Sequence, residues 1–338
     1  MEKVIAISDI HLGEEECTLK EGVLDSFRDE LKGIGQIDQL VLLGDVLDLS
    51  MASFAKACAM AKEFFAKIGE LEGIKEIIFI PGNHDHHLWV QHIEHYGMIT
   101  QIQEGRLPEE PDYIKEFKGK GSFLAGLLPD EAKEKLTVKY PNHLAQVKGK
   151  NYFFHHGHHL SKEGTLLMTL KEALEEEISL NEFELHNSSI HELIQYSLEQ
   201  SDSMREKMEY AWTKGGALSA ILSVVDEMTD GKGWTGRMAR LAYQLSLMWK
   251  SNAMRGSKID DRIIGDMERY LKLSKASNYD WFVFGHTHIP EGRRREGSFS
   301  MVNTGSWFES QERIHNTYVV IDDKVVIRRL GDTTPCWE

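Results

Sequence analysis

The residues best suited to chemistry are histidine, aspartate and asparagine side chains that fall in five short segments. The segments are Asp9-Ile10-His11, Gly44-Asp45-Val46-Leu47-Asp48, Gly82-Asn83-His84-Asp85, His155-His156-Gly157-His158-His159 and Gly285-His286-Thr287-His288. Carboxylates, imidazoles and an amide, without thiolates, are ligands of hard to borderline metal ions. The segments offer more ligands than one ion can use, so two ions that share a bridging carboxylate fit them better.

Each of these segments follows a short apolar run that predicts a β-strand. The five runs are Val4–Ser8, Gln39–Leu43, Glu76–Ile80, Tyr152–His155 and Trp281–Phe284. Helical patterns at Glu21–Leu31 and Met51–Glu70 separate the first three runs, which predicts two consecutive βαβ units and a parallel sheet. Ligands of such sheets bind beyond the carboxyl ends of the strands, so we expect the five segments to meet at one rim.

Further strands are predicted in the second half of the chain. They are Leu136–Tyr140, Leu144–Val147, Ser298–Asn303, Thr317–Ile321 and Val325–Arg329, the last two joined as a hairpin. A second sheet packed on the first is therefore expected. Residues 86–135 are polar and contain three prolines, which favours a loop with short helices. Residues 160–275 contain no proline and are predicted to be helical.

Composition narrows the class of protein. The chain has 338 residues, with 39 Lys+Arg against 54 Asp+Glu and a formal net charge of -15, which disfavours non-specific binding of duplex DNA. Its three cysteines have no metal or disulfide spacing, so a cytoplasmic location is expected. The first residues do not resemble a signal peptide, and no apolar run is long enough to predict a transmembrane helix.

Taken together, the five segments resemble the five motifs of the calcineurin-like metallophosphoesterases. The resemblance covers residues 3–85, 137–159 and 280–330. It implies an α/β fold, a four-layer α/β/β/α sandwich, with two divalent metal ions, of which Mn, Fe or Zn are expected. Residues 1–159 and 276–338 would form this core, with the polar insertion at about 86–135, and residues 160–275 would be a helical insertion that caps the site.

The resemblance also implies roles for individual residues. The ligand positions are Asp9, His11 and His288 for the first ion, Asn83, His156 and His286 for the second, and Asp45 as the bridge between them. His156 is preferred to His155 because it directly precedes Gly157. A hydroxide that bridges the metals would attack phosphorus, and His84 would contact the phosphate and protonate the leaving group.

Other residues are candidates for supporting or substrate contacts. They are Asp48, Asp85, His158, His159, Arg237 and Arg240. Asp48 is expected to orient a neighbouring ligand by a hydrogen bond, or to have a purely structural role. His158 and His159 lie beside the fourth motif and could contact substrate.

Two positions depart from the protein serine/threonine phosphatase branch of the family. Leu49 stands where that branch has Arg, and Asp85 stands where it has Glu. Both departures argue against a phosphoprotein phosphatase. The motifs are similar to those of the nuclease branch and of small prokaryotic phosphoesterases, including UDP-diacylglucosamine pyrophosphatases, and do not choose between them.

The predicted cap contains a basic segment. Six basic residues and no acidic one occur in it, namely Lys232, Arg237, Arg240, Lys250, Arg255 and Lys258. An amphipathic helix with solvated arginines is one interpretation. Binding of a second phosphate by Arg237 or Arg240 is another, and a helix on a membrane surface is a third.

Three functional hypotheses remain from the sequence. The leading one is a metal-dependent phosphoesterase that hydrolyses a small or medium monoester, diester or pyrophosphate. A metal-dependent nuclease is the second, and the acidic net charge weighs against it. A non-catalytic scaffold of the same fold is the third. A homo-oligomer that forms through the helical insertion is compatible with each of them.

Overall fold

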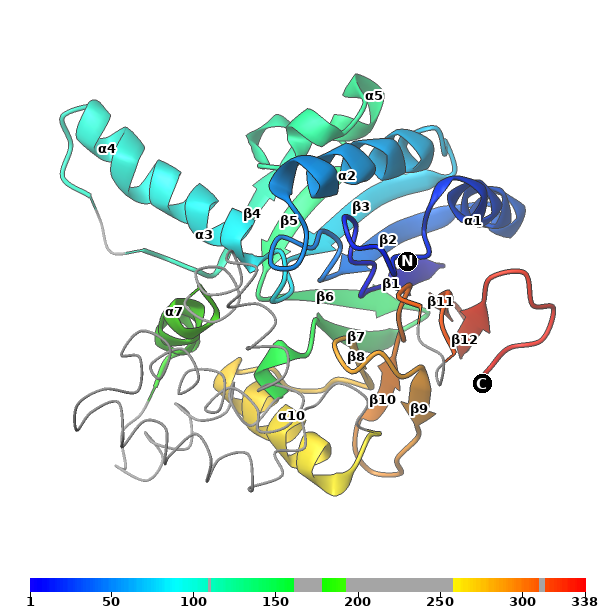
Figure 1. Ribbon diagram of the computed structural model, residues 1–338. Helices are drawn as coiled ribbons and strands as arrows, with labels where there is room; N and C mark the ends of the chain where they lie inside the picture. The colour runs from blue at the N-terminus through cyan, green and yellow to red at the C-terminus, as the bar shows by residue number, and fades with distance from the viewer. Residues whose placement is uncertain (109–110, 161–177, 193–257, 310–313) are drawn as a thin grey trace, which may run out of the picture.

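The computed structural model describes residues 1–108, 111–160, 178–192, 258–309 and 314–338 (Figure 1). Most of the predicted helical cap lies outside these residues. The same holds for Arg237 and Arg240, so their predicted roles are not addressed by the structure.

The first sheet has seven strands in the order β12-β11-β1-β2-β3-β5-β4. Their bounds are Val4–Ile7 for β1, Ile37–Leu43 for β2, Ile74–Ile80 for β3, Lys115–Lys118 for β4, Leu136–Tyr140 for β5, Thr317–Ile321 for β11 and Val325–Arg329 for β12. Strands β1, β2, β3 and β5 run parallel to one another. With α1 (Glu21–Ile34) and α2 (Phe54–Gly69) between them, the first three strands confirm the predicted βαβ units.

The second sheet has five strands in the order β6-β7-β8-β10-β9. Their bounds are Asn142–Val147 for β6, Lys150–His155 for β7, Trp281–Phe284 for β8, Glu291–Arg293 for β9 and Ser300–Asn303 for β10. Strand β8 is parallel to both β7 and β10. The carboxyl ends of β7 and β8 therefore point the same way.

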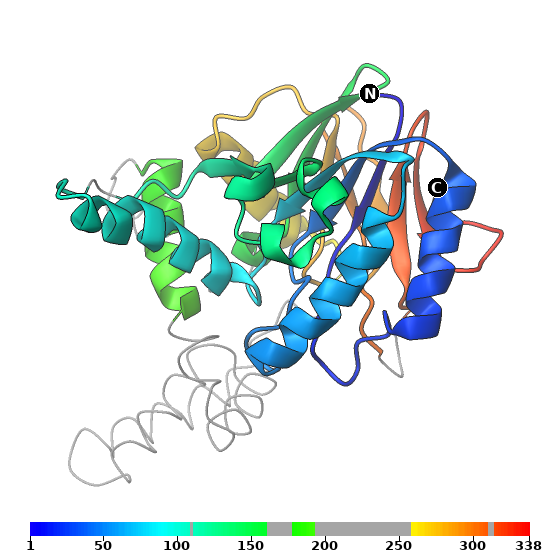
Figure 2. The same ribbon diagram turned by 90° about the horizontal axis from the view of Figure 1, so that it is seen from above.

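The two sheets pack face to face, and helices cover their outer faces (Figures 1 and 2). Alternate residues of β1 show how: Val4 and Ala6 lie in the core between the sheets, whereas Ile5 and Ile7 pack toward α1 and α2. This double burial explains why the strand is apolar at every position. Helix α10 (Asp261–Leu273) packs on the outer face of the second sheet. The predicted α/β fold with two packed sheets is confirmed.

The apolar spacing of each covering helix matches the face that it buries. Helix α1 buries Leu24, Phe27 and Leu31, which recur at intervals of three and four residues. Helix α2 begins after Ser53, whose side chain accepts a hydrogen bond from the backbone N–H of Lys56. None of the described helices is long and apolar enough to cross a lipid bilayer.

The polar stretch 86–135 is more regular than predicted. Helix α3 (His86–Glu94), the π-helix η1 (His95–Ile99) and α4 (Thr100–Gln103) follow one another without a break, and Lys115–Lys118 form the edge strand β4. The stretch also contains the short helices η2 (Gly119–Gly121), η3 (Ala125–Leu127) and α5 (Asp130–Lys133). Two further helices, η4 (His158–Leu160) and α7 (Leu180–His191), come later in the chain. Strand β4 is short and lysine-flanked, as protected sheet edges often are, so its sequence carries little strand signal.

Replacing a core aromatic of the second sheet tests the packing. Phe282 is fully buried between β8 and α10, whereas Leu144 on β6 is 51% exposed. Phe282→Ala should lower the free energy of unfolding by about 3–5 kcal/mol because it leaves a cavity. Leu144→Ala should cost less than about 0.5 kcal/mol. Guanidinium unfolding curves measure both, and equal midpoints for the two variants would contradict the assigned layers.

Candidate metal centre

The loops that follow five strands meet at one rim of the sandwich. Asp9 and His11 follow β1, Asp45 follows β2, Asn83 follows β3, His156 follows β7, and His286 and His288 follow β8. Three groups of possible metal ligands occur there, and within each group the ligand atoms lie within 4.8 Å of one another. The groups are Asp9, His11 and His288; His11, Asp45 and His84; and Asp45, His156 and His286. Asn83 joins them through His156, so the seven predicted ligands and His84 are brought together.

The first group converges through His288. Its Nε2 lies 3.1 Å from Oδ1 of Asp9 and 3.3 Å from Nε2 of His11. Nδ1 of His11 donates to Oδ2 of Asp48 at 2.8 Å, which leaves Nε2 as the nitrogen that carries the lone pair. A hydrogen bond of this kind fixes the tautomer and orientation of metal-binding histidines.

The second group has the same design. Nδ1 of His156 donates to the backbone carbonyl of Leu43 at 2.9 Å, and Nε2 lies 3.1 Å from both Oδ2 of Asp45 and Oδ1 of Asn83. Nδ1 of His286 is buried and has no hydrogen-bond partner in the part of the chain that the structure describes. Imidazole nitrogens that converge with carboxylate and amide oxygens in this way can all turn lone pairs toward one cation, so both groups fit metal ions.

Asp45 connects the two groups. Its Oδ2 faces His156, and its Oδ1 accepts a hydrogen bond of 2.8 Å from the backbone N–H of His84. The side chain is 1% exposed. Its position between the groups is the one a bridging ligand would take.

The backbone at the rim has an unusual conformation. Nine non-glycine residues of the described chain have positive φ, and five of them are predicted ligands. These five are Asp9 (52°), His11 (54°), Asp45 (51°), His286 (67°) and His288 (60°). The left-handed region is costly for residues with a side chain and is found where surrounding structure enforces it, often at functional sites. Here it turns the ligands inward directly after the strands.

Two glycines make room for these carboxylates. A Cβ atom at Gly82 would collide with the Asp45 side chain, and one at Gly285 would collide with Ser8 and Asp9. Ser8 hydrogen-bonds Asp9, and the backbone N–H of His286 donates to Oδ2 of Asp9 at 2.9 Å. A larger residue at Gly82 or Gly285 would therefore clash with the predicted ligands or with Ser8.

Imidazoles keep the buried carboxylates ionised. Burial alone would raise the pKa of Asp9, but the nearby His288 and His156 lower it to about 2. Burial opposes the charge of Asp45 in the same way, and His156 and His84 hold its pKa well below the ordinary value. Burial would lower the pKa of His156, but Asp45 raises it to about 9. The buried carboxylates at this rim are stabilised by nearby positive charge, which divalent cations can supply.

Asp48 holds both His11 and His84. Its Oδ2 accepts from Nδ1 of His11 and lies 2.9 Å from Nδ1 of His84, which is also 2.7 Å from Oγ of Ser50. Its Oδ1 accepts from the backbone N–H of Ser50 at 3.1 Å. Ser50 is not among the residues predicted from the sequence, although a serine two residues after aspartate is typical of a turn of this kind.

Asp85 accepts hydrogen bonds from the backbone of the rim loops. Its carboxylate accepts from the backbone N–H groups of Gly82 (2.6 Å), Val46 (2.8 Å) and Leu47 (3.3 Å). Burial and the nearby Asp45 raise its pKa to about 7. Asp85 therefore ties the loop after β2 to the loop after β3 and does not contact the converging ligand atoms.

A small pocket, with a volume of about 10 Å³, lies beside His84. It is lined by Leu49, Ser50, Asn83, His84, His87, His191 and Glu192. Nδ1 of His87 donates to Glu192 at 2.6 Å. His191 and Glu192 lie at the end of α7, inside the predicted insertion, and no local motif marked them. His158 and His159 do not line this pocket, and each is only 1% exposed.

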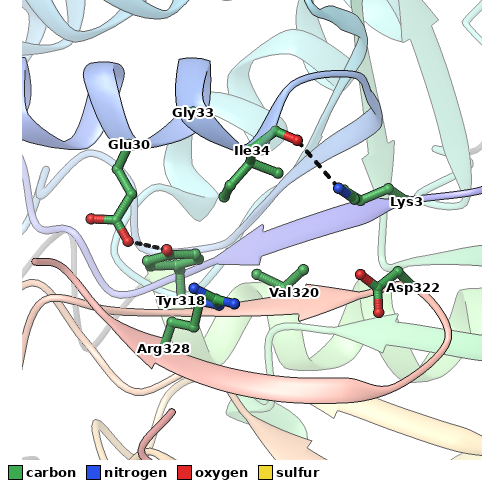
Figure 3. Close-up of a pocket in the computed structure, with 8 residues that line it drawn as sticks. All are labelled: Lys3, Glu30, Gly33, Ile34, Tyr318, Val320, Asp322 and Arg328. Atoms are coloured by element: carbon green, nitrogen blue, oxygen red, sulfur yellow. Dashed lines mark hydrogen bonds between the residues drawn. The ribbon is translucent and has the colours of Figure 1, made fainter. Parts of the chain in front are cut away.

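A second hollow, of about 400 Å³, lies elsewhere, between α1 and the strands β1, β11 and β12 (Figure 3). Its lining comprises Lys3, Glu30, Gly33, Ile34, Tyr318, Val320, Asp322 and Arg328. Glu30 hydrogen-bonds Tyr318, and Nζ of Lys3 donates to the carbonyl of Ile34 at 3.3 Å (Figure 3). None of the predicted site residues lines it.

Comparison with known proteins identifies the family of this chain. The model of the calcineurin-like phosphoesterase family matches residues 2–218. The chain belongs to this family, whose members depend on binuclear metal centres. No curated protein matches the chain.

Solved structures with a similar arrangement include YfcE, a phosphoesterase from E. coli (13% identity, TM-score 0.38, 99% of this chain and 96% of that chain covered). A dimetal phosphatase from Danio rerio has 12% identity and a TM-score of 0.42, with 97% and 95% covered. A single-mutant form of Vps29 from Entamoeba histolytica has 10% identity and a TM-score of 0.37, with 99% and 97% covered.

The glycine at the end of β8 provides a test of the rim that does not require a substrate. Gly285→Ala should displace Ser8 and Asp9 and thereby reduce the bound metal, measured by elemental analysis of the purified protein. Gly126→Ala is the matched control, because nothing lies within 4 Å of a Cβ at that position. Equal metal content in the two variants would show that Asp9 is not a ligand.

Proposed function

We propose that this protein is a binuclear metal-dependent phosphoesterase that hydrolyses a small or medium phosphate ester, as a monoesterase, a diesterase or a pyrophosphatase. The observation that carries the proposal is the position of the Asp45 carboxylate between two groups of imidazole and carboxylate ligands. Membership of the calcineurin-like phosphoesterase family supports the same reaction class.

The ligand assignment follows from the two groups. Asp9, His11 and His288 would hold one ion, and Asp45 would be shared with the other. The second ion would be held by Asn83, His156 and His286. When bound, the two divalent ions would polarise phosphoryl oxygens and lower the pKa of an attacking water molecule. Mn, Fe or Zn are the expected metals for such oxygen and nitrogen ligands.

His84 is proposed as the general acid. Its side chain is 6% exposed and lines the pocket, while its Nδ1 faces Asp48. Asp48 would stabilise the imidazolium form, so that Nε2 can donate a proton to the leaving oxygen. The bond from the backbone of His84 to Asp45 fixes this residue relative to the ligands. The Asp48–His84 pair is thus suited to proton delivery at the pocket.

The alternatives are less well supported. A scaffold that only retains the fold would not require all seven ligand positions and His84, and all are present here. A nuclease would require a basic surface, and the segment that carries most of the basic run, 232–257, lies outside the described residues. The cytoplasmic location and oligomerisation through the insertion stay predictions.

His84→Asn should lower kcat by roughly 10²–10⁴-fold, because general acid catalysis contributes about that much. The loss should be larger for an alkyl phosphate than for p-nitrophenyl phosphate, whose leaving group needs less protonation. Metal content should be unchanged, and His95→Asn, at an exposed histidine, should retain full activity. An equal loss on both substrates would refute the acid role.

Asp45→Ala should abolish hydrolysis of both p-nitrophenyl phosphate and bis-p-nitrophenyl phosphate and release both ions of the centre. The wild-type rates on these two esters, together with a plasmid digestion assay, separate a monoesterase, a diesterase and a nuclease. Retention of both ions by Asp45→Ala would contradict the bridging assignment.

A further inference from the structure

A second group of possible metal ligands lies beside the two-ion centre and shares no residue with it. It comprises His158 and His159, in η4, and His191, at the end of α7. One ring nitrogen of each lies within 4.8 Å of the others. Of the four such groups among the described residues, this one shares no member with the other three and consists only of histidines.

The three rings are packed closely. Ring centroids lie 3.9 Å apart for His158 and His159, 5.0 Å for His158 and His191, and 5.8 Å for His159 and His191. Imidazole nitrogens on rings packed this closely can converge on one ion.

His159 is oriented as metal-binding histidines are. Its Nε2 donates to Oε2 of Glu184 at 2.6 Å, which leaves Nδ1 with the lone pair. Glu184 is fully buried and also accepts from the hydroxyl groups of Tyr140 and Tyr270, each at 2.8 Å. A carboxylate that fixes the far nitrogen of a histidine is a common partner of zinc ligands.

Two ring nitrogens in this cluster lack partners. Nδ1 of His159 and Nε2 of His191 are buried and make no hydrogen bond within the described residues. Buried polar atoms without a partner are rare in proteins and call for an explanation such as an ion.

Helix α7 presents a polar face to the cluster. Glu184, Ser188 and His191 are spaced by four and three residues and so share one side of the helix. Ser188 and Glu184 are buried, and Oγ of Ser188 lies 2.9 Å from Nε2 of His86. Burying a face of this composition is costly unless its groups have partners. Glu184 and Ser188 have such partners, whereas Nε2 of His191 has none among the described residues.

We propose that His158, His159 and His191 form a third metal site, of the zinc type, with Glu184 as a positioning residue. Three imidazoles without a carboxylate favour Zn²⁺ over Mn²⁺. Zinc bonds of about 2.0–2.1 Å hold nitrogens roughly 3.3–3.4 Å apart, so the ligands need to converge by at most roughly 1.5 Å. A tetrahedral ion with three protein ligands keeps one position for water or a substrate oxygen.

The location suggests what this ion would do. The ring of His158 lies 5.5 Å from that of His156, and His191 lines the pocket with Asn83 and His84. If the proposed phosphoesterase function holds, the third ion would provide positive charge for a second anionic group of the substrate. The existence of the site does not depend on that function.

Zinc titration of chelator-treated, tag-free protein tests the proposal. Wild type should retain three zinc ions per chain after gel filtration, and His191→Gln should retain two. The control is His186→Gln, an exposed histidine of the same helix, which should retain three. With Mn²⁺, wild type and His191→Gln should each retain two.

The ligand and positioning roles are tested separately. In an Asp45→Ala background the single remaining site should give the visible absorption of tetrahedral Co²⁺, and adding His159→Gln should abolish it. Glu184→Gln should lower the affinity for the third zinc ion by roughly 10–100-fold while leaving the other two ions in place. Unchanged affinity in Glu184→Gln would remove its positioning role.

Failure of this site and failure of the two-ion centre give different results. Equal zinc content in wild type and His191→Gln would overturn the third site, whatever Asp45→Ala does. One zinc ion that is lost in His191→Gln but kept in Asp45→Ala would support the third site and overturn the two-ion centre instead.

Discussion

A buried carboxylate among imidazoles is the constraint on which the rest of this structure depends. Asp45 is almost inaccessible to water and faces His156, yet its pKa is held well below the ordinary value. A carboxylate in such a place must be compensated by nearby positive charge and by donors. The neighbouring strands supply both, because their ends bring His156, His286 and the backbone N–H of His84 around it.

The architecture of the two packed sheets allows these side chains to converge. Parallel strands in both sheets end at one rim, and the apolar layers hold them there. Locally, Asp9 and Asp45 adopt left-handed conformations, and Gly82 and Gly285 leave space for carboxylates. Asp85 then ties two of the loops through backbone donors. Strain at the rim is thus supported by rigid packing beneath it.

Much of the fold follows from local sequence. Continuous apolar runs located β1, β2, β3, β7 and β8, and the segments after them supplied the side chains that meet at the rim. Strand β4 was not predicted from the sequence because it is short and charged. Strand β9 was not predicted because it has only three residues, Glu291–Arg293. The sequence also did not predict how the strands divide between the two sheets. Leu136–Tyr140 and the C-terminal hairpin, which lie in the second half of the chain, join the first sheet.

The parts of the site that could not be predicted come from distant segments. His191 and Glu192 reach the pocket from α7, and Glu184 reaches His159 across 25 residues. No spacing rule connects such residues, because their proximity is set by how α7 docks. His158 and His159 were candidates for substrate contact; they are buried in a histidine cluster, and their roles stay proposals.

The central claim is tested most directly by anomalous diffraction from crystals of metal-loaded protein. We predict two peaks about 3.5–4 Å apart that flank the Asp45 carboxylate. One would be bounded by Asp9, His11 and His288, and the other by Asn83, His156 and His286. A single peak, or none at this rim, would contradict the account.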